Sequence, residues 1–107
     1  MIFAKGRVRK SGMNRLESAY AELLAGRIKF GQILLYEYEA VKFRLGDGAW
    51  FTPDFMVMLP DGQIEFHETK GFMREAANVR LKVAASKYPF KFFLVKRIKG
   101  AWNIEEI

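Results

Sequence analysis

The turn Pro60-Asp61-Gly62 constrains the fold of this chain more than any other feature of its sequence. Proline, aspartate and glycine favour tight turns. The stretches on both sides, about residues 50–59 and 63–70, are interpreted as strands. This pattern predicts an antiparallel hairpin. If the turn is centred on Asp61, residues equally distant from it in sequence pair with each other, and Asp54 faces Glu68.

The sequence before this hairpin predicts a helix and a further strand. Asn14 and Glu17 form a capping-box pattern, which predicts that a helix begins there and runs to about Ala25, where Gly26 can end it. Residues 33–45 alternate between apolar and polar as a strand does. The apolar parity flips near Ala40, which indicates a bulge or two short strands.

After the hairpin, the pattern predicts a helix over residues 74–87, a strand over 90–97 and a short last strand from about residue 101. The order of elements predicts an α/β (α+β) fold in which helices flank a central mixed sheet. We expect one domain over residues 1–107, with 1–12 as a basic N-terminal arm. The residues expected to face the core are Leu16, Ala19, Tyr20 and Leu23 in the first helix, and Ala76, Val79, Val83 and Ala84 in the second.

Two absences in the composition exclude whole classes of chemistry. The chain has no cysteine and one histidine, His67, so it can form neither disulfides nor cysteine or two-histidine zinc sites. Carboxylates, lysines, hydroxyls and a hard cation remain as means of catalysis. There is no apolar run of membrane-spanning length and no secretory signal pattern, so we expect a soluble, cytoplasmic protein.

The charge of the chain favours a polyanionic partner, nucleic acid above all. The net charge is +6, from 18 basic and 12 acidic residues, and an excess of this size on a small domain is typical of such proteins. A soluble basic protein with wet helix faces would look the same. The candidate DNA-binding residues lie in the N-terminal region and in the second helix: Lys5, Arg7, Arg9, Lys10, Arg15, Arg74, Arg80 and Lys82.

The predicted hairpin register places Asp54, Glu68 and Lys70 on one face of the sheet. Directly opposed residues have Cβ atoms roughly 5 Å apart, and Lys70 shares the face of Glu68 because side chains alternate along a strand. Facing carboxylates repel unless a cation lies between them, and oxygen ligands suit Mg²⁺ or Mn²⁺. Lys70 would then orient or deprotonate a water, or steady the charge of a transition state. A register shifted by one residue would separate Asp54 from Glu68.

The same residues resemble a known nuclease signature. Pro53-Asp54, followed after thirteen residues by Glu68-Thr69-Lys70, is similar to the PD-(D/E)XK motif of restriction-type nucleases. The predicted order over residues 13–97 resembles the α-β-β-β-α-β core of that superfamily. Within it, the chain resembles small phage and prophage proteins and is similar in layout to archaeal and phage Holliday junction resolvases.

The resemblance implies a Mg²⁺- or Mn²⁺-dependent DNA endonuclease, usually a homodimer that acts on branched DNA. It implies that Asp54 and Glu68 hold the metal, with the carbonyl of Thr69 as a further ligand, and that Lys70 assists catalysis. Thr69 is polar where an apolar residue is more usual in the motif. A glutamate early in the first helix completes the acidic cluster in such resolvases, and Glu17 matches it better than Glu22.

Simpler interpretations exist for each of these residues. Asp54 can be a turn residue, Glu68 and Lys70 a surface ion pair, and Glu17 a helix cap alone. We expect His67 at the edge of the core or on the surface, and Glu37 and Glu39 on the strand surface unless the bulge turns one toward the site. Tyr36, Tyr38, Trp50 and Trp102 are candidates for a dimer interface or for the core.

Three functions therefore remain open from the sequence. The first is a Holliday junction resolvase. The second is a nuclease of the same type with another task, such as trimming, repair, restriction or phage DNA processing. The third is a nucleic-acid-binding module without catalytic activity.

Overall fold

The fold is known from a computed structural model, which describes residues 2–3, 12–71 and 75–107. In chain order the elements are β1 (Ile2–Phe3), α1 (Arg15–Lys29), β2 (Leu35–Tyr38), β3 (Val41–Gly46), β4 (Ala49–Phe51), β5 (Phe55–Met58), β6 (Ile64–Lys70), α2 (Glu75–Lys87), β7 (Lys91–Ile98) and β8 (Ala101–Glu106). Neither helix in the described part of the chain is long and apolar enough to cross a membrane.

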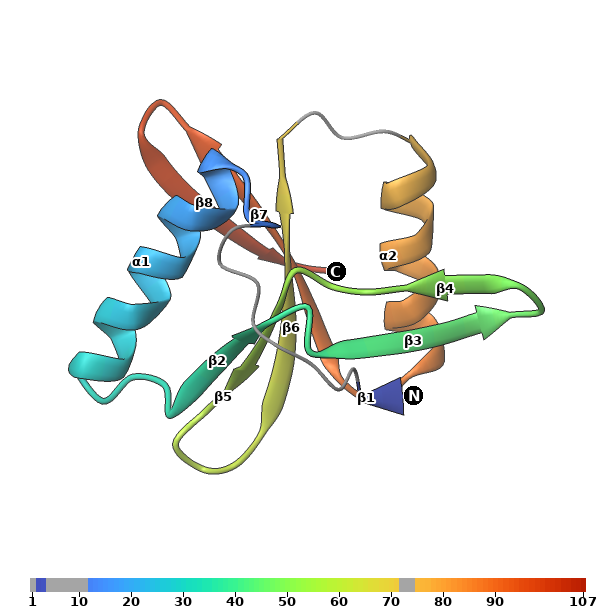
Figure 1. The fold of residues 1–107 in the computed structure, drawn as a ribbon, viewed down its shortest axis with the longest axis horizontal. Helices are drawn as coiled ribbons and strands as arrows, with labels where there is room; N and C mark the ends of the chain where they lie inside the picture. Colours follow the sequence, from blue (N-terminus) through green and yellow to red (C-terminus); the bar gives the residue numbers. More distant parts are fainter. Residues whose placement is uncertain (1, 4–11, 72–74) are drawn as a thin grey trace.

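A five-stranded mixed sheet forms the centre of the molecule, in the order β2-β5-β6-β7-β8. β6 and β7 run parallel, and the other neighbouring strands run antiparallel. α1 lies on one side of this sheet, and α2 lies on the other side together with the hairpin of β3 and β4 (Figure 1). The α+β class with helices flanking a central mixed sheet is therefore confirmed.

Two apolar clusters hold these layers together, one on each face of the central sheet. The cluster on the α1 side contains Tyr20, Ala21, Leu24, Ile33, Tyr38, Phe55, Val57 and Val95. The cluster on the α2 side contains Ala40, Val41, Phe43, Phe51, Met56, Phe66, Leu81, Ala84, Phe92 and Leu94. Both faces of β5 are buried because its successive side chains enter opposite clusters.

The hairpin of β5 and β6 has the predicted register. Phe55 pairs with His67 and Met58 pairs with Ile64, so paired residues are equally distant from Asp61. Gly62 has a φ of 88°, a left-handed conformation that glycine adopts without steric strain. The turn residues therefore determine which side chains of the two strands meet.

Two predicted strands are divided in the structure. Residues 33–45 form β2 and β3, which belong to different sheets, and this agrees with the predicted break near Ala40. The prediction of one continuous strand over residues 50–59 was wrong, because β4 and β5 are separated by the segment 52–54. Pro53 has no N–H to continue a ladder, and the chain passes here from the three-stranded sheet β1-β3-β4 to the central sheet.

α1 begins as predicted and ends later than predicted. Asn14 and Glu17 form the capping box, each accepting a hydrogen bond from the backbone N–H of the other, at 2.8 and 2.9 Å. The helix continues through Gly26 to Lys29, so the predicted end at Gly26 was wrong. Gly31, with a φ of 73°, supplies the left-handed residue that ends a helix.

The buried faces of both helices are rotated from the predicted ones. α1 buries Glu17, Tyr20, Ala21 and Leu24, whereas Leu16, Ala19 and Leu23 are half-buried. α2 buries Leu81 and Ala84, while Val79 is 50% and Val83 36% exposed; the side chain of Ala76 lies outside the described part. The apolar residues of α2 occur around most of the helix, so their spacing does not select the side that the β3–β4 hairpin covers.

Candidate active site

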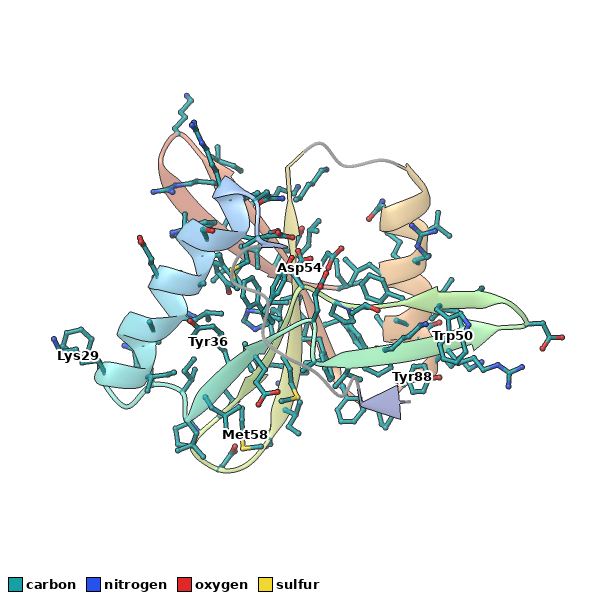
Figure 2. All side chains as sticks on the ribbon, viewed as in Figure 1. Lys29, Tyr36, Trp50, Asp54, Met58 and Tyr88 are labelled. Carbon is teal, nitrogen blue, oxygen red and sulfur yellow. The ribbon has the colours of Figure 1, made fainter. Side chains whose placement is uncertain are left out.

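Three elements meet at the carboxyl end of β6. The segment 52–54 leads from β4 into β5, Glu68 lies near the end of β6, and the first turn of α1 covers the same place. Asp54 lies near the middle of the molecule (Figure 2). Its backbone N–H donates a hydrogen bond of 2.9 Å to Oε1 of Glu68, so the structure brings Asp54 and Glu68 side by side.

Thr69 fixes the carboxylate of Asp54. Oδ2 of Asp54 accepts a hydrogen bond of 2.8 Å from the backbone N–H of Thr69 and one of 2.7 Å from its hydroxyl. Asp54 is only 8% exposed, so these bonds compensate part of the loss of hydration. These hydrogen bonds also explain why the residue between Glu68 and Lys70 is polar. This role of the Thr69 hydroxyl was not predicted from the sequence.

Glu17 faces the same place from the helix. Its side chain is buried, and its Oε1 accepts hydrogen bonds from the Asn14 backbone N–H at 2.9 Å and from the Tyr38 hydroxyl at 3.0 Å. The capping interpretation is thus confirmed, and the same side chain lies beside Asp54. The contact with Tyr38 was not foreseen, because it joins a helix and a strand whose docking the sequence does not specify.

The crowding of carboxyl groups changes their acidity. Burial raises the pKa of Asp54 to about 7, although the two bonds from Thr69 act in the opposite direction, and the neighbouring Glu17 raises it further. Burial, followed by the charge of Asp54, raises the pKa of Glu68 to about 8. Burial and the carboxyl group of Glu17 also raise the pKa of Tyr38. The carboxyl groups of Asp54 and Glu68 therefore tend to hold protons near neutral pH unless a positive charge compensates them.

Two lysines lie beyond the carboxylates on the neighbouring strands. Lys70 is half-buried two residues after Glu68, and it pairs in register with Lys96 of the parallel strand β7. Both side chains project on the face that carries Glu68, because side chains alternate along each strand. The position of Lys96 could not be predicted from the sequence, since nothing in the local pattern specifies the register of a parallel pair that is joined through a helix.

His67 differs from the expectation, whereas Glu39 lies on the surface at the break between β2 and β3, near the site. His67 is 1% exposed, and its ring nitrogens contact the Tyr20 hydroxyl at 2.5 Å and Oε1 of Glu65 at 2.9 Å, so it is a core residue and not an edge or surface one. Glu39 is exposed, has a φ of 49°, and donates its backbone N–H to the carbonyl of Asp54 at 2.8 Å. Its charge is one cause of the raised pKa of Glu68, while Glu37 remains on the strand surface.

The predicted DNA-binding residues are exposed on the two helices or lie outside the described residues. Arg15 is exposed at the start of α1, and Arg80 and Lys82 are exposed on α2. Of the aromatic candidates, Tyr38 belongs to the core, and Tyr36, Trp50 and Trp102 are half-buried. The predicted residues that lie outside the described part of the chain are Lys5, Arg7, Arg9, Lys10 and Arg74.

The donors at the candidate site are those that a hard cation takes. They are carboxylate and backbone carbonyl oxygens, which Mg²⁺ and Mn²⁺ prefer. Within residues 2–3, 12–71 and 75–107, no group of three or more histidine or acidic side chains is already spaced to hold a metal ion. The donor chemistry of Asp54, Glu68 and the Thr69 carbonyl nevertheless fits a divalent cation, because the buried Asp54 lies beside the half-buried Glu68 and both carboxyl groups have raised pKa values.

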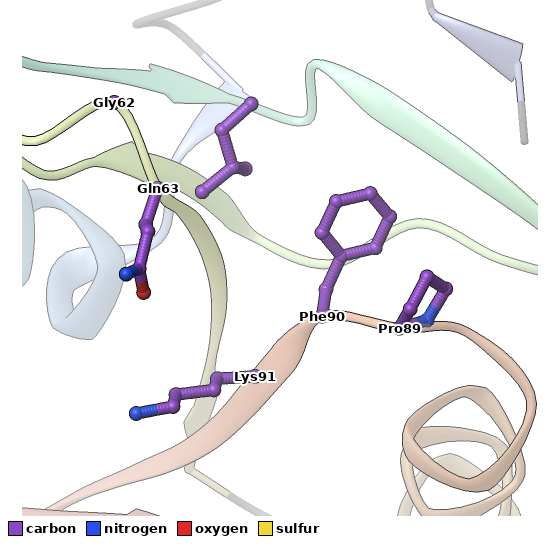
Figure 3. Close-up of a pocket in the computed structure, with 6 residues that line it drawn as sticks. Gly62, Gln63, Pro89, Phe90 and Lys91 are labelled. Carbon is purple, nitrogen blue, oxygen red and sulfur yellow. The ribbon is translucent and has the colours of Figure 1, made fainter.

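A separate hollow of about 560 Å³ lies at the other end of β6 (Figure 3). It is lined by Gly62, Gln63, Ile64, Pro89, Phe90 and Lys91. Ile64 begins β6 and Lys70 ends it, so the hollow is removed from the carboxylates and contributes nothing to them.

Comparison of the chain with known protein families, with curated proteins and with solved structures finds no match.

Proposed function

We propose that this protein is a metal-dependent endodeoxyribonuclease of the PD-(D/E)XK type. The observation that carries the proposal is the pairing of Asp54 with Glu68 across the β5–β6 hairpin, with Glu17 against Asp54 and Lys70 beyond Glu68. These are the residues of the nuclease signature, and they converge from three elements. An ion pair on a strand surface would not bury its carboxylates in this way.

The order of the elements supports the same proposal. Without the β3–β4 hairpin, the chain runs α1-β2-β5-β6-α2-β7, which is the α-β-β-β-α-β order of restriction-type nucleases. β2, β5 and β6 are antiparallel, and β7 joins β6 in parallel through α2. In this proposal, β3 and β4 form an insertion immediately before the segment that carries Asp54.

Each residue of the site receives a role. Asp54, Glu68 and the carbonyl of Thr69 would hold Mg²⁺ or Mn²⁺, and Glu17 would complete the acidic cluster. A bound cation supplies Lewis-acid polarisation of a phosphate oxygen and lowers the pKa of water. Lys70 orients or deprotonates the attacking water, or stabilises the negative charge of the phosphate in the transition state. The hydrogen bonds from Thr69 hold Asp54 in place.

Branched DNA such as a Holliday junction is the favoured substrate. Cleavage of a junction needs two coordinated cuts, and a symmetric homodimer provides two sites. The net charge of +6 favours DNA over an uncharged substrate. A role in trimming, repair, restriction or phage DNA processing uses the same residues and differs only in the DNA that is cut.

The experiment compares labelled four-way junctions, flaps and linear duplexes in the presence of Mg²⁺ or Mn²⁺. Cutting is expected in the wild type and is expected to be lost in Asp54→Asn and Lys70→Ala, whereas binding of the junction survives. Glu22→Gln is the matched control for Glu17→Gln, since both glutamates are on α1 and Glu22 is exposed. Only Glu17→Gln should reduce cutting.

Binding of DNA without any cutting in either metal would reject the nuclease and leave a DNA-binding module. Cutting that prefers the linear duplex or the flap would retain the nuclease and reject the junction as its substrate.

A further inference from the structure

The hairpin of β3 and β4 starts and ends at the candidate site. β3 follows Glu39 after one residue, and β4 ends at Phe51, directly before the segment that carries Asp54. From there the hairpin extends past α2 to the side of the molecule (Figure 1). The six residues of β3 span roughly 20 Å at the usual rise of a strand. A ligand that binds along this hairpin therefore extends toward the carboxylates of the candidate site.

The inner face of the hairpin is anchored to the body of the protein. Phe43 and Phe51 are buried in the cluster on the α2 side. The ring of Phe43 packs edge-on against the rings of Phe66 and Phe92, at centroid distances of 4.8 and 5.3 Å. The hydroxyl of Tyr88 donates to the carbonyl of Arg44. These contacts fix the direction of the hairpin relative to the site.

The outer face of the hairpin carries an aromatic ring beside two cations. Lys42 and Arg44 are exposed, and Trp50 pairs directly with Arg44 across the two strands. Nζ of Lys42 lies 4.8 Å from the centre of the Trp50 ring. The core lies on the opposite face, so Trp50 is not needed to fill it. Figure 2 shows Trp50 out on the hairpin, away from the central sheet.

We infer that this outer face, consisting of Lys42, Arg44 and Trp50, binds the phosphate backbone of duplex DNA beside the cutting site. The inference rests on the proposed nuclease function. The site itself is rich in carboxylates that repel phosphate, so the cations that hold the DNA must flank it. Lys42 and Arg44 are two residues apart on one strand face, which separates them by roughly 7 Å along the strand. DNA carries one phosphate per about 3.4 Å of axis on each strand, so the two cations are far enough apart to contact different phosphates.

Trp50 adds a surface on which a sugar or an exposed base can lie, and aromatic side chains beside cations are a recurrent means of contact with nucleic acid. Asp47 opposes the function of this surface. Its carboxylate accepts a hydrogen bond of 2.7 Å from Arg44 at the tip of the hairpin, and it neutralises part of the charge there. Loss of either cation is therefore expected to weaken DNA binding, and loss of the Asp47 carboxylate is expected to strengthen it.

The test measures the binding of a fluorescently labelled linear duplex in EDTA, where no cutting occurs, as a function of KCl concentration. Each of Lys42→Gln and Arg44→Gln is expected to reduce the slope of log affinity against log salt by about 1. The matched control is Lys29→Gln, a charge removed from an exposed residue at the far end of α1 (Figure 2), with no change in slope expected. Asp47→Asn is expected to bind more tightly than the wild type.

A fluorescence measurement reports on the surface directly. The chain has two tryptophans, so Trp102→Phe leaves Trp50 as the only one. Addition of the unlabelled duplex is expected to quench or shift the emission of Trp50. Circular dichroism and the melting temperature show that each variant is folded before it is compared.

The outcomes separate this inference from the proposed function. If the wild type binds and cuts DNA while Lys42→Gln and Arg44→Gln behave like Lys29→Gln and Trp50 emission does not change, the inference is wrong and the nuclease remains. If the hairpin variants weaken binding but the wild type never cuts, the binding surface remains and the nuclease is wrong. A wild type that does not bind duplex DNA overturns the inference, and cutting of the four-way junction then decides separately whether the protein is a nuclease.

Discussion

Replacement of Asp54 by asparagine is expected to stabilise the metal-free protein at pH 8. The folded protein holds the carboxyl group of Asp54 buried beside Glu68 and Glu17, and its pKa rises from 3.8 to about 7. A carboxyl group with a raised pKa in the folded state binds protons that the unfolded chain releases, so stability falls as the pH rises from about 4 through 7. Asparagine removes this penalty and still accepts the hydrogen bonds from Thr69.

The size of the effect follows from the change in acidity. One pKa unit corresponds to about 1.4 kcal/mol, and a rise of about three units sets an upper bound of roughly 4 kcal/mol at full ionisation. Because the groups are mutually coupled, the single substitution is expected to recover about half of this bound, roughly 2 kcal/mol. For a domain of this size that amounts to an increase in melting temperature of about 10 °C.

The assay is thermal unfolding in EDTA, followed by circular dichroism at pH 8 and at pH 4. At pH 4 the folded wild type already holds the protons, so the stabilisation should disappear. Glu22→Gln is the control, because its carboxylate is exposed and its neutralisation should change little. An Asp54→Asn protein that melts lower than the wild type at pH 8, or gains as much at pH 4 as at pH 8, would refute the electrostatic reasoning.

The remaining predictions concern the helix cap, the buried histidine, the turn and the pH dependence of cutting. Glu17→Ala is expected to lower the free energy of unfolding by about 1 kcal/mol, because it breaks the capping box with Asn14; urea denaturation measures this loss, and Glu17→Gln should lose less. Tyr20→Phe is expected to lower it by roughly 1–3 kcal/mol, since the buried ring of His67 loses a partner, and an unchanged urea midpoint would contradict this. Gly62→Ala should lower it by about 1 kcal/mol because the left-handed φ of 88° strains a residue with a Cβ, again measured in urea. The rate of cutting with Mg²⁺ is expected to rise from pH 6 to pH 8, since carboxyl groups with pKa values of about 7 and 8 must lose protons before they hold a cation; a rate that falls over this range would contradict it.

The sequence by itself determined the central hairpin and the pairing within it. The turn at Asp61 sets the register, and the alternation of side chains along a strand then determines that Asp54 and Glu68 meet. The capping box of Asn14 and Glu17 was also predictable. All of these features depend on residues that are close in sequence or joined by a tight turn, so local chemistry is sufficient to specify them.

Only the tertiary structure decided which distant residues join them. The docking of α1 buries Glu17 against Tyr38 and beside Asp54, and the parallel pairing of β6 with β7 places Lys96 beside Lys70. The same packing buried His67 and turned Val79 of α2 toward solvent. Apolar residues on more than one side of a helix allow several rotations, and the choice among them depends on the shape of the surface that the helix covers.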